Sequence, residues 1–141
     1  MATNIEQIKD DFEFLDDWED RYRYVIELGK GLEALPDADK NEANKVSGCV
    51  SQVWVRSDAD EKPDPIMSFI GDSDALIVKG LVAIMIAAAN GRTASEIENL
   101  DMVALMEKLG LDEHLSPQRA NGLRSLITKM KQDAKLVAAA S

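Results

Sequence analysis

The chain has 141 residues and a formal net charge of −10, and a chain of this size buries enough surface to fold without a disulfide or a metal. Its negative field repels phosphate backbones, so we expect no binding to nucleic acid. The N-terminus lacks the features of a signal peptide, and the most apolar run, residues 75–89, is shorter than the roughly 20 residues of a membrane span. We therefore expect a single domain over residues 1–141, located in the cytoplasm and not bound to a membrane.

Two short amphipathic helices are predicted near the N-terminus, because apolar residues recur there at three- and four-residue intervals. The apolar positions of the two helices are Ile5, Ile8, Phe12 and Leu15, and then Trp18, Tyr22, Val25 and Ile26. The second helix is expected to end at Gly29 or Gly31, since glycine accepts the left-handed conformation that closes many helices.

Three short segments rich in β-branched and aromatic residues follow a polar loop and predict a small antiparallel sheet. The predicted strands are Lys45–Ser47, Gln52–Ser57 and Ile66–Ile70. Gly48 separates the first two strands, and a turn containing two prolines separates the last two. A meander of this kind puts Cys49 at or beside the tip of the first hairpin.

The remainder of the chain is predicted to be helical. Ser73 or Asp74 can cap a helix over residues 75–89, because a short side-chain oxygen accepts a hydrogen bond from a free amide of the first turn. Three more helices are indicated by the capping box of Thr93 and Glu96, by apolar residues from Met102 to Leu109, and by Ser116 followed by Pro117. Helices around one block of strands predict an α+β domain, with helices packed on one face of a three-stranded sheet.

Cys49 is the first candidate for chemistry, because it is the only cysteine and a thiolate is a strong nucleophile. One cysteine can form neither an internal disulfide nor a multi-cysteine metal site, which fits a reducing compartment. Gly48 permits a tight turn that projects the sulfur outward, whereas the neighbouring valines and Trp54 could equally enclose it. From these residues alone, an inert cysteine that serves packing is the alternative.

His114 is the only histidine, and with Cys49 it could form the pair of a cysteine hydrolase. A partly exposed residue at the start of a helix is the alternative for His114.

Arg119 falls in the first turn of the last helix, where a cation opposes the helix dipole, which suggests contact with a carboxylate or a partner. An ordinary surface arginine is the other interpretation. The acidic runs lack the alternating pattern of a calcium loop, so we predict no metal site.

Residues 48–54, GCVSQVW, resemble the cysteine motif Gly-Cys-x-Ser-x-Val-Trp of the SufE family, the sulfur acceptors of Fe–S cluster assembly. Residues 71–75 and 77–81, GDSDA and IVKGL, are similar to the second signature of that family. The third signature resembles HLSP at residues 114–117 together with Arg119 and the Gly-Leu pair at 122–123. Segments 18–22 and 26–29 also fit its N-terminal helices, so the resemblance spans nearly the whole chain.

The resemblance implies a partner, a cysteine desulfurase of the SufS type that uses pyridoxal phosphate and holds sulfur on its own cysteine. The residue matching Cys49 would accept this sulfur as a persulfide, and the acceptor would stimulate the desulfurase and relay sulfur to a scaffold complex of the SufBCD type. The chain would itself bind no cofactor, and it would act as a carrier and activator rather than as a stand-alone enzyme. The implied fold is similar to that of the IscU/NifU scaffolds, and the sulfur is expected to be sheltered until docking.

Within this resemblance, we expect Gly48 to be the joint of a hairpin tip that carries Cys49 and Ser51 outward on docking. The positions expected for partner contact or support are Asp74, Glu107, His114 and Arg119. The cluster scaffold itself is a rival interpretation within the same fold. A scaffold provides about three or four cysteine or equivalent ligands, however, and this chain has one cysteine.

Overall fold

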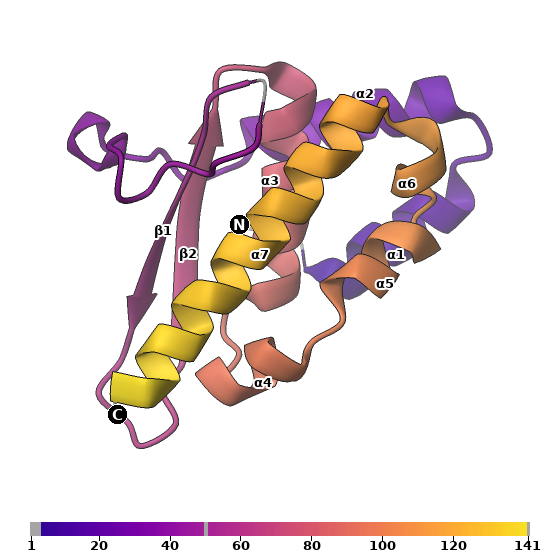
Figure 1. Ribbon diagram of the computed structural model, residues 1–141. Coiled ribbons are helices and arrows are strands. Elements are labelled where there is room, and N and C mark those ends of the chain that lie inside the picture. The colour runs from indigo at the N-terminus through magenta and orange to yellow at the C-terminus, as the bar shows by residue number, and fades with distance from the viewer. Residues whose placement is uncertain (1–3, 50, 141) are drawn as a thin grey trace.

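The computed structural model describes residues 4–49 and 51–140 (Figure 1). Its elements, in chain order, are α1 (Ile5–Phe14), α2 (Trp18–Lys30), the 3₁₀-helix η1 (Asp37–Asp39), β1 (Val53–Ala59), β2 (Met67–Ser73), α3 (Leu76–Ala89), α4 (Ala94–Asn99), α5 (Met102–Lys108), α6 (Leu111–His114) and α7 (Pro117–Ala140). No helix in the described part of the chain combines the length and the apolar character needed to cross a membrane.

The two strands pair antiparallel, in register from Val53 opposite Ser73 to Ala59 opposite Met67. Alternate residues of this pair point to one buried face, and its large apolar members are Val53, Val55, Met67 and Phe69. On that face α3 packs against β2 and α7 packs against β1, and both helices lie on the same side of the sheet (Figure 1). The predicted class, an α+β domain with helices on one face of a small antiparallel sheet, is confirmed.

The predicted strand Lys45–Ser47 is wrong. This segment makes one isolated antiparallel bridge, between Lys45 and Trp54, and the Val46 amide donates a hydrogen bond of 2.8 Å to the Val53 carbonyl beside it. A turn before the bridge and a glycine in the left-handed conformation after it leave too few extended residues for a strand. The sheet of the described residues therefore has two strands rather than three.

Residues 37–46, called here the 37–46 segment, are tied across the outer face of the strand pair by ion pairs. Asp39 lies 2.7 Å from the Arg56 guanidinium on β1. Lys40 lies 3.2 Å from the Asp72 carboxylate on β2, and Lys79 of α3 lies 3.4 Å from the same carboxylate. The segment that leads to Cys49 is thus fixed to both strands and, through Asp72, to α3.

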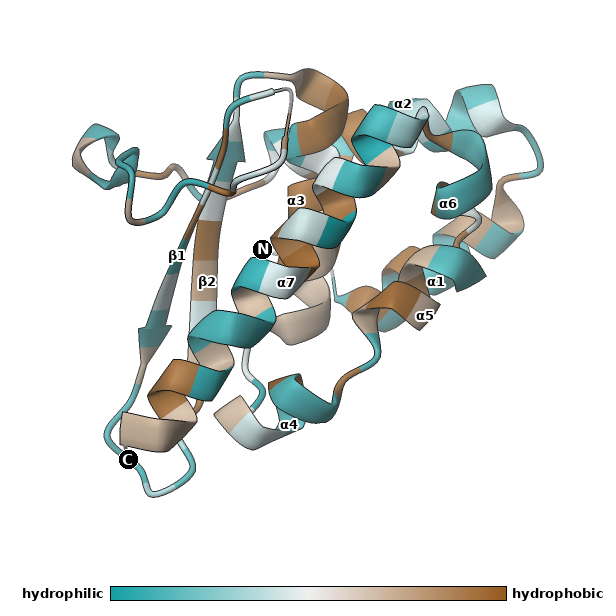
Figure 2. Ribbon diagram, in the orientation of Figure 1, coloured by the Kyte–Doolittle hydropathy of each residue, from teal (hydrophilic) through white to brown (hydrophobic). Residues whose placement is uncertain are grey.

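Helices α2 and α3 approach each other backbone to backbone. A Cβ on Gly29 would lie 2.8 Å from the Gly80 amide nitrogen, and a Cβ on Gly80 would lie 2.0 Å from the Val25 carbonyl oxygen. Gly29 therefore lies inside α2 at this crossing, and Gly31 is the C-cap of the helix. Figure 2 shows hydrophobic residues concentrated along α3 and β2, which form the centre of the core.

The predicted helix starts were partly right. The capping box of Thr93 and Glu96 is present at α4. Neither Ser73 nor Asp74 is the N-cap of α3, however; Ala75 takes that position without a side-chain hydrogen bond. The cap prediction failed because pairing with β1 extends β2 as far as Ser73.

Candidate functional site

Cys49 lies in the connection between the Lys45 bridge and β1. Residues 47–52 form this connection, called here the cysteine loop, and within it Val50 lies outside the described residues. Gly48 has a positive φ of 88°, a conformation in which a Cβ is strained. The glycine that precedes the cysteine thus sets the turn that places Cys49 against α7.

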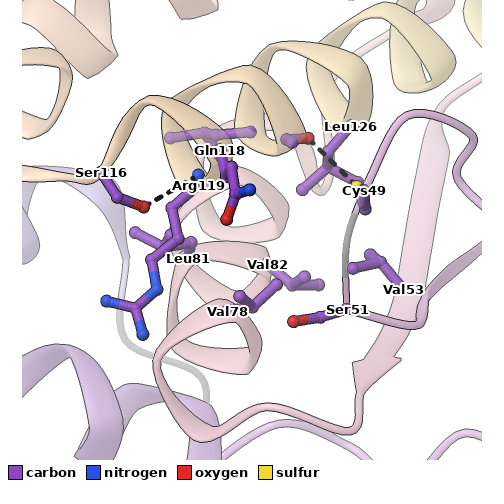
Figure 3. Close-up of a pocket in the computed structure, with 12 residues that line it drawn as sticks. Cys49, Ser51, Val53, Val78, Leu81, Val82, Ser116, Gln118, Arg119 and Leu126 are labelled. Atoms are coloured by element: carbon purple, nitrogen blue, oxygen red, sulfur yellow. Dashed lines mark hydrogen bonds between the residues drawn. The ribbon is translucent and has the colours of Figure 1, made fainter.

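The cysteine side chain lies against the backbone of α7. Its thiol donates to the carbonyl oxygen of Gly122, with Sγ 3.5 Å from that oxygen (Figure 3). A Cβ on Gly122 would lie 3.3 Å from Sγ. The absence of a side chain at this position allows the loop and the helix to come close enough for that contact.

A cavity of about 350 Å³ lies beside the thiol. Its walls come from the cysteine loop, β1, α3, the residue before α7 and α7 itself, through Cys49, Ser51, Val53, Val78, Leu81, Val82, Ser116, Gln118, Arg119, Gly122, Leu123 and Leu126. Figure 3 shows the apolar side chains of α3 facing the loop, with the Arg119 guanidinium away from the sulfur. The arrangement offers a space next to the thiol that is aliphatic toward α3 and polar toward Ser116, Gln118 and Arg119.

Burial determines how the thiol ionises. The Cys49 side chain is half-buried, and this desolvation raises the pKa of the thiol above its ordinary value of 9.0. The cysteine is therefore protonated and weakly nucleophilic while the loop lies against α7.

Asp74 supports the far end of the cysteine loop. Its carboxylate accepts a hydrogen bond of 3.0 Å from the Gln52 amide, and its own amide donates to the Gln52 carbonyl at 3.2 Å. The side chain is exposed and does not line the cavity. Asp74 is thus placed to hold the loop where it joins β1.

The structure does not bring His114 to Cys49. The His114 ring stacks on Trp18, with centroids 4.0 Å apart and planes at 15°, and its carbonyl accepts a hydrogen bond from the Tyr22 hydroxyl. Glu107 is exposed on α5. Neither His114 nor Glu107 lines the cavity beside Cys49, so the cysteine–histidine pair is not formed.

The part of α7 that contacts the cysteine loop is not predicted by the individual residues. Gly122 was noted only within a family motif, and Ser125 was not noted, although its Oγ lies 2.8 Å from where a Cβ on Gly48 would be. The available signal was the glycine inside a predicted helix, which often marks close backbone approach. Within residues 4–49 and 51–140, no group of three or more His, Cys, Asp or Glu side chains is placed to hold a metal ion.

Comparisons with known proteins agree over nearly the full chain. The SufE model, described as an Fe-S metabolism associated domain, matches residues 6–134. An uncharacterized SufE-like protein of Rhizobium meliloti is 54% identical over 134 residues, which are 94% of this chain and 96% of that protein. A second one, of Rhizobium etli, is 56% identical over 141 residues, which are 99% and 95% of the two chains.

A relative whose name states a function has a lower sequence identity to this chain than the two SufE-like proteins. The sulfur acceptor protein CsdE of Escherichia coli is 41% identical over 125 residues, which are 89% of this chain and 84% of CsdE. The solution structure of a hypothetical protein from Thermus thermophilus matches with a TM-score of 0.76 and covers 100% of both chains, and at 19% identity it supports the fold alone. With a family model and relatives of this identity across its length, the chain belongs to the SufE family.

Proposed function

We propose that this protein is a sulfur acceptor of Fe–S metabolism, which takes sulfur as a persulfide on Cys49 from a SufS-type cysteine desulfurase. The proposal rests on the position of Cys49, in a loop between fixed ends and beside a cavity lined in part by aliphatic side chains. The Fe-S description of the family model and the sulfur-acceptor name of CsdE support it. The pyridoxal phosphate belongs to the partner, and this chain needs no cofactor of its own.

The transfer has the form of thiol–disulfide exchange. The Cys49 thiolate attacks the outer sulfur of the desulfurase persulfide, a new S–S bond forms at Cys49, and the old S–S bond breaks. The outer sulfur keeps its proton, and the desulfurase cysteine leaves as a thiolate. Because one sulfur atom moves without an external oxidant or reductant, a single cysteine is sufficient on the acceptor.

The cavity suits storage of the accepted sulfur. An S–S bond is about 2 Å long, so the outer sulfur would fill only a small part of the space of about 350 Å³. The aliphatic side chains of α3 and β1 would shield the persulfide on their side from water and oxidants, which limits further oxidation of the cysteine. A location in the reducing cytoplasm is part of the proposal.

Transfer to and from partners requires the loop to open. We propose that the cysteine loop swings away from α7 about Gly48 and carries Cys49 and Ser51 outward. Binding in this open form would stimulate the desulfurase, and a SufBCD-type scaffold would receive the sulfur in a second encounter. Among the positions proposed for contact or support, Arg119 lines the cavity and Asp74 holds the loop, whereas Glu107 and His114 are exposed outside it and would contact a large partner.

The hydrolase alternative receives no support from the geometry, because a cysteine hydrolase needs a base beside its nucleophile. No histidine is among the described residues that line the Cys49 cavity. A cluster scaffold is disfavoured for another reason: a single cysteine supplies too few ligands for a cluster.

The test is to incubate the protein with a SufS-type desulfurase and free cysteine, and to measure intact mass and desulfurase turnover. We expect wild type to gain one sulfur that a thiol reductant removes, and to raise turnover. Cys49→Ser should gain none and should fail to stimulate. Wild type that stays unmodified while the desulfurase turns over would refute the acceptor role.

A further inference from the structure

A second hollow on α7 is lined by cations, although the chain as a whole carries a net charge of −10. This α7 hollow lies between residues 43–47 and the middle of α7, and its volume is about 490 Å³. Its walls include cations and hydroxyl groups, from Lys45, Arg124 and Lys129 and from Ser47, Ser125 and Thr128. Among the described residues, it shares no lining residue with the Cys49 cavity. The α7 hollow is therefore a separate feature of the surface beside the sulfur site.

The positive charge of the α7 hollow is not balanced by carboxylates in its walls. Another hollow, of about 480 Å³ and called here the balanced hollow, has as many carboxylates as cations: Glu6, Asp10, Glu13, Lys9, Arg21 and Lys108. No aspartate or glutamate is among the described residues that line the α7 hollow. In a chain with 26 acidic and 16 basic residues, a hollow with cations alone in its walls attracts an anion from solution.

Two of these cations are available to a ligand. Lys129 is paired with Asp133 at 3.3 Å, so its charge is already compensated. Lys45 and Arg124 are exposed, and neither makes an ion pair with another described residue. The Arg124 guanidinium donates one hydrogen bond, of 3.2 Å, to the Asn121 side-chain oxygen, which leaves most of its five N–H groups unused. Two uncompensated positive charges match a dianion such as phosphate.

The hydroxyl groups supply further donors. Thr128 already donates to the Arg124 carbonyl at 3.0 Å, but the Ser47 and Ser125 hydroxyls make no hydrogen bond to any other described residue. Lysine, arginine and serine side chains are the usual donors to phosphate oxygens in proteins. Because these donors come from both walls, they suit a tetrahedral anion, whose oxygens point in several directions, better than a planar carboxylate.

Both walls of the α7 hollow are fixed to β1 before any ligand binds. Beside Lys45, the Asn44 carbonyl accepts a hydrogen bond of 2.8 Å from the Val55 amide. On the other wall, the Asp133 carboxylate that pairs with Lys129 accepts a hydrogen bond of 3.2 Å from the Ser57 hydroxyl. A ligand that binds between walls already in position loses less free energy to ordering.

We propose that the α7 hollow binds a compact phosphate dianion, either free phosphate or the phosphate group of a small metabolite. The net charge of −10 disfavours a polyanion that extends across the surface, whereas a small anion interacts mainly with charges within about 8 Å in physiological salt. The bound group would lie beside Ser125, whose Oγ would be 2.8 Å from a Cβ on Gly48. It would be an effector next to the sulfur site rather than a substrate in it.

Titration of the purified full chain with inorganic phosphate, followed by nitrogen–proton correlation NMR at constant ionic strength, tests the site. We expect saturable shifts confined to amides around the α7 hollow, and tighter binding as pH rises and phosphate becomes a dianion. Lys45→Gln and Arg124→Gln should each weaken binding roughly fivefold. The matched control is Lys108→Gln, which removes a cation from the balanced hollow and should bind phosphate as wild type does.

Glycerol phosphate and acetate, titrated in the same way, identify the ligand. Binding of the ester at least as tight as that of phosphate assigns the site to a metabolite, and weaker binding of the ester assigns it to free phosphate. The proposal is overturned if neither phosphate compound gives a saturable shift, if acetate binds equally well, or if both variants bind as wild type does. The measurement uses no desulfurase, so its result is independent of the acceptor role.

Discussion

Two consecutive stretches beside β1 are held in different ways. The 37–46 segment is fixed by the Asp39–Arg56 ion pair at 2.7 Å and the Lys40–Asp72 ion pair at 3.2 Å. The cysteine loop that follows has its ends fixed, but Cys49 itself is held by a thiol contact of 3.5 Å, and thiols are weak donors. The comparison teaches that the domain can anchor the base of a loop with ion pairs and hold the cysteine at its tip by a much weaker contact.

Of the substitutions that test this difference, Gly48→Val is expected to have the largest effect, on the rate of sulfur uptake by Cys49. A β-branched side chain at the positive φ of 88° costs roughly 1–3 kcal/mol, and it removes rotations that the joint needs. We expect sulfur uptake on Cys49 to slow about tenfold, and the midpoint of thermal unfolding to fall by roughly 4 °C for each kcal/mol of strain, with the helical circular dichroism of the folded domain retained. Time-resolved intact mass after mixing with a desulfurase measures the rate.

The control for this joint is Gly48→Asn, since asparagine enters the left-handed region more readily than valine. It should retain more of the wild-type uptake rate. Equal uptake by wild type and Gly48→Val would show that Gly48 is not the joint.

A smaller effect is expected from Asp74→Ala, which loosens the far end of the cysteine loop. The Gln52 amide would lose the carboxylate that accepts it at 3.0 Å, and an ordinary hydrogen bond contributes about 0.5–1.5 kcal/mol. Cys49 should then be alkylated roughly two- to threefold faster at neutral pH, as followed by loss of free thiol. Asp74→Asn keeps an acceptor oxygen and should behave as wild type; slower alkylation in Asp74→Ala would contradict the anchoring role.

The smallest effect concerns Asp72, which holds the 37–46 segment through Lys40. It is a change in the free energy of unfolding at low pH. Burial of Asp72 tends to raise the pKa of its carboxyl, but the Ser73 amide, Lys40 and Lys79 outweigh burial and hold that pKa below its usual 3.8. The folded state thus binds this proton less strongly than the unfolded chain. The resulting stabilisation is present above the usual value and is lost as pH falls through the lower one.

Asp72→Asn should therefore flatten the acid decline in the free energy of unfolding, by at most about 1 kcal/mol. Urea unfolding at a series of pH values measures this change. Asp58→Asn, which removes an exposed partner of Arg56, should leave the decline closer to that of wild type. An unchanged decline in Asp72→Asn would show that Asp72 is not an anchor of the 37–46 segment.

Local signals predicted the elements better than their ends. The capping box of Thr93 and Glu96 starts α4 as expected, because it depends on residues three apart. The start of α3 was misplaced because Ser73 pairs with Val53, twenty residues away along the chain. The prediction of a third strand at Lys45–Ser47 was wrong for a related reason. A local preference for extended backbone does not show how many residues will pair with a neighbouring strand.

The candidate site shows the same difference between local signals, which were predictive, and contacts with distant residues, which were not. Cys49 and Gly48 were found from adjacent residues, whereas the shelter of the thiol depends on α7, whose Gly122 lies 73 positions later. Pairing of Cys49 with His114 was an open alternative in the sequence, and it fails because the His114 ring stacks on Trp18. Whether a lone cysteine is enclosed depends on distant helices, and a local pattern does not report on them.

The crossing of α2 and α3 at Gly29 and Gly80 has a consequence for the sulfur cavity. Because these backbones already touch, α3 cannot retreat toward α2, and the Val78, Leu81 and Val82 side of the cavity is an immobile wall. The opposite side is the cysteine loop. A chamber with one rigid wall keeps its shape on that side when the loop moves, so an accepted sulfur atom would find the same space each time the loop closed.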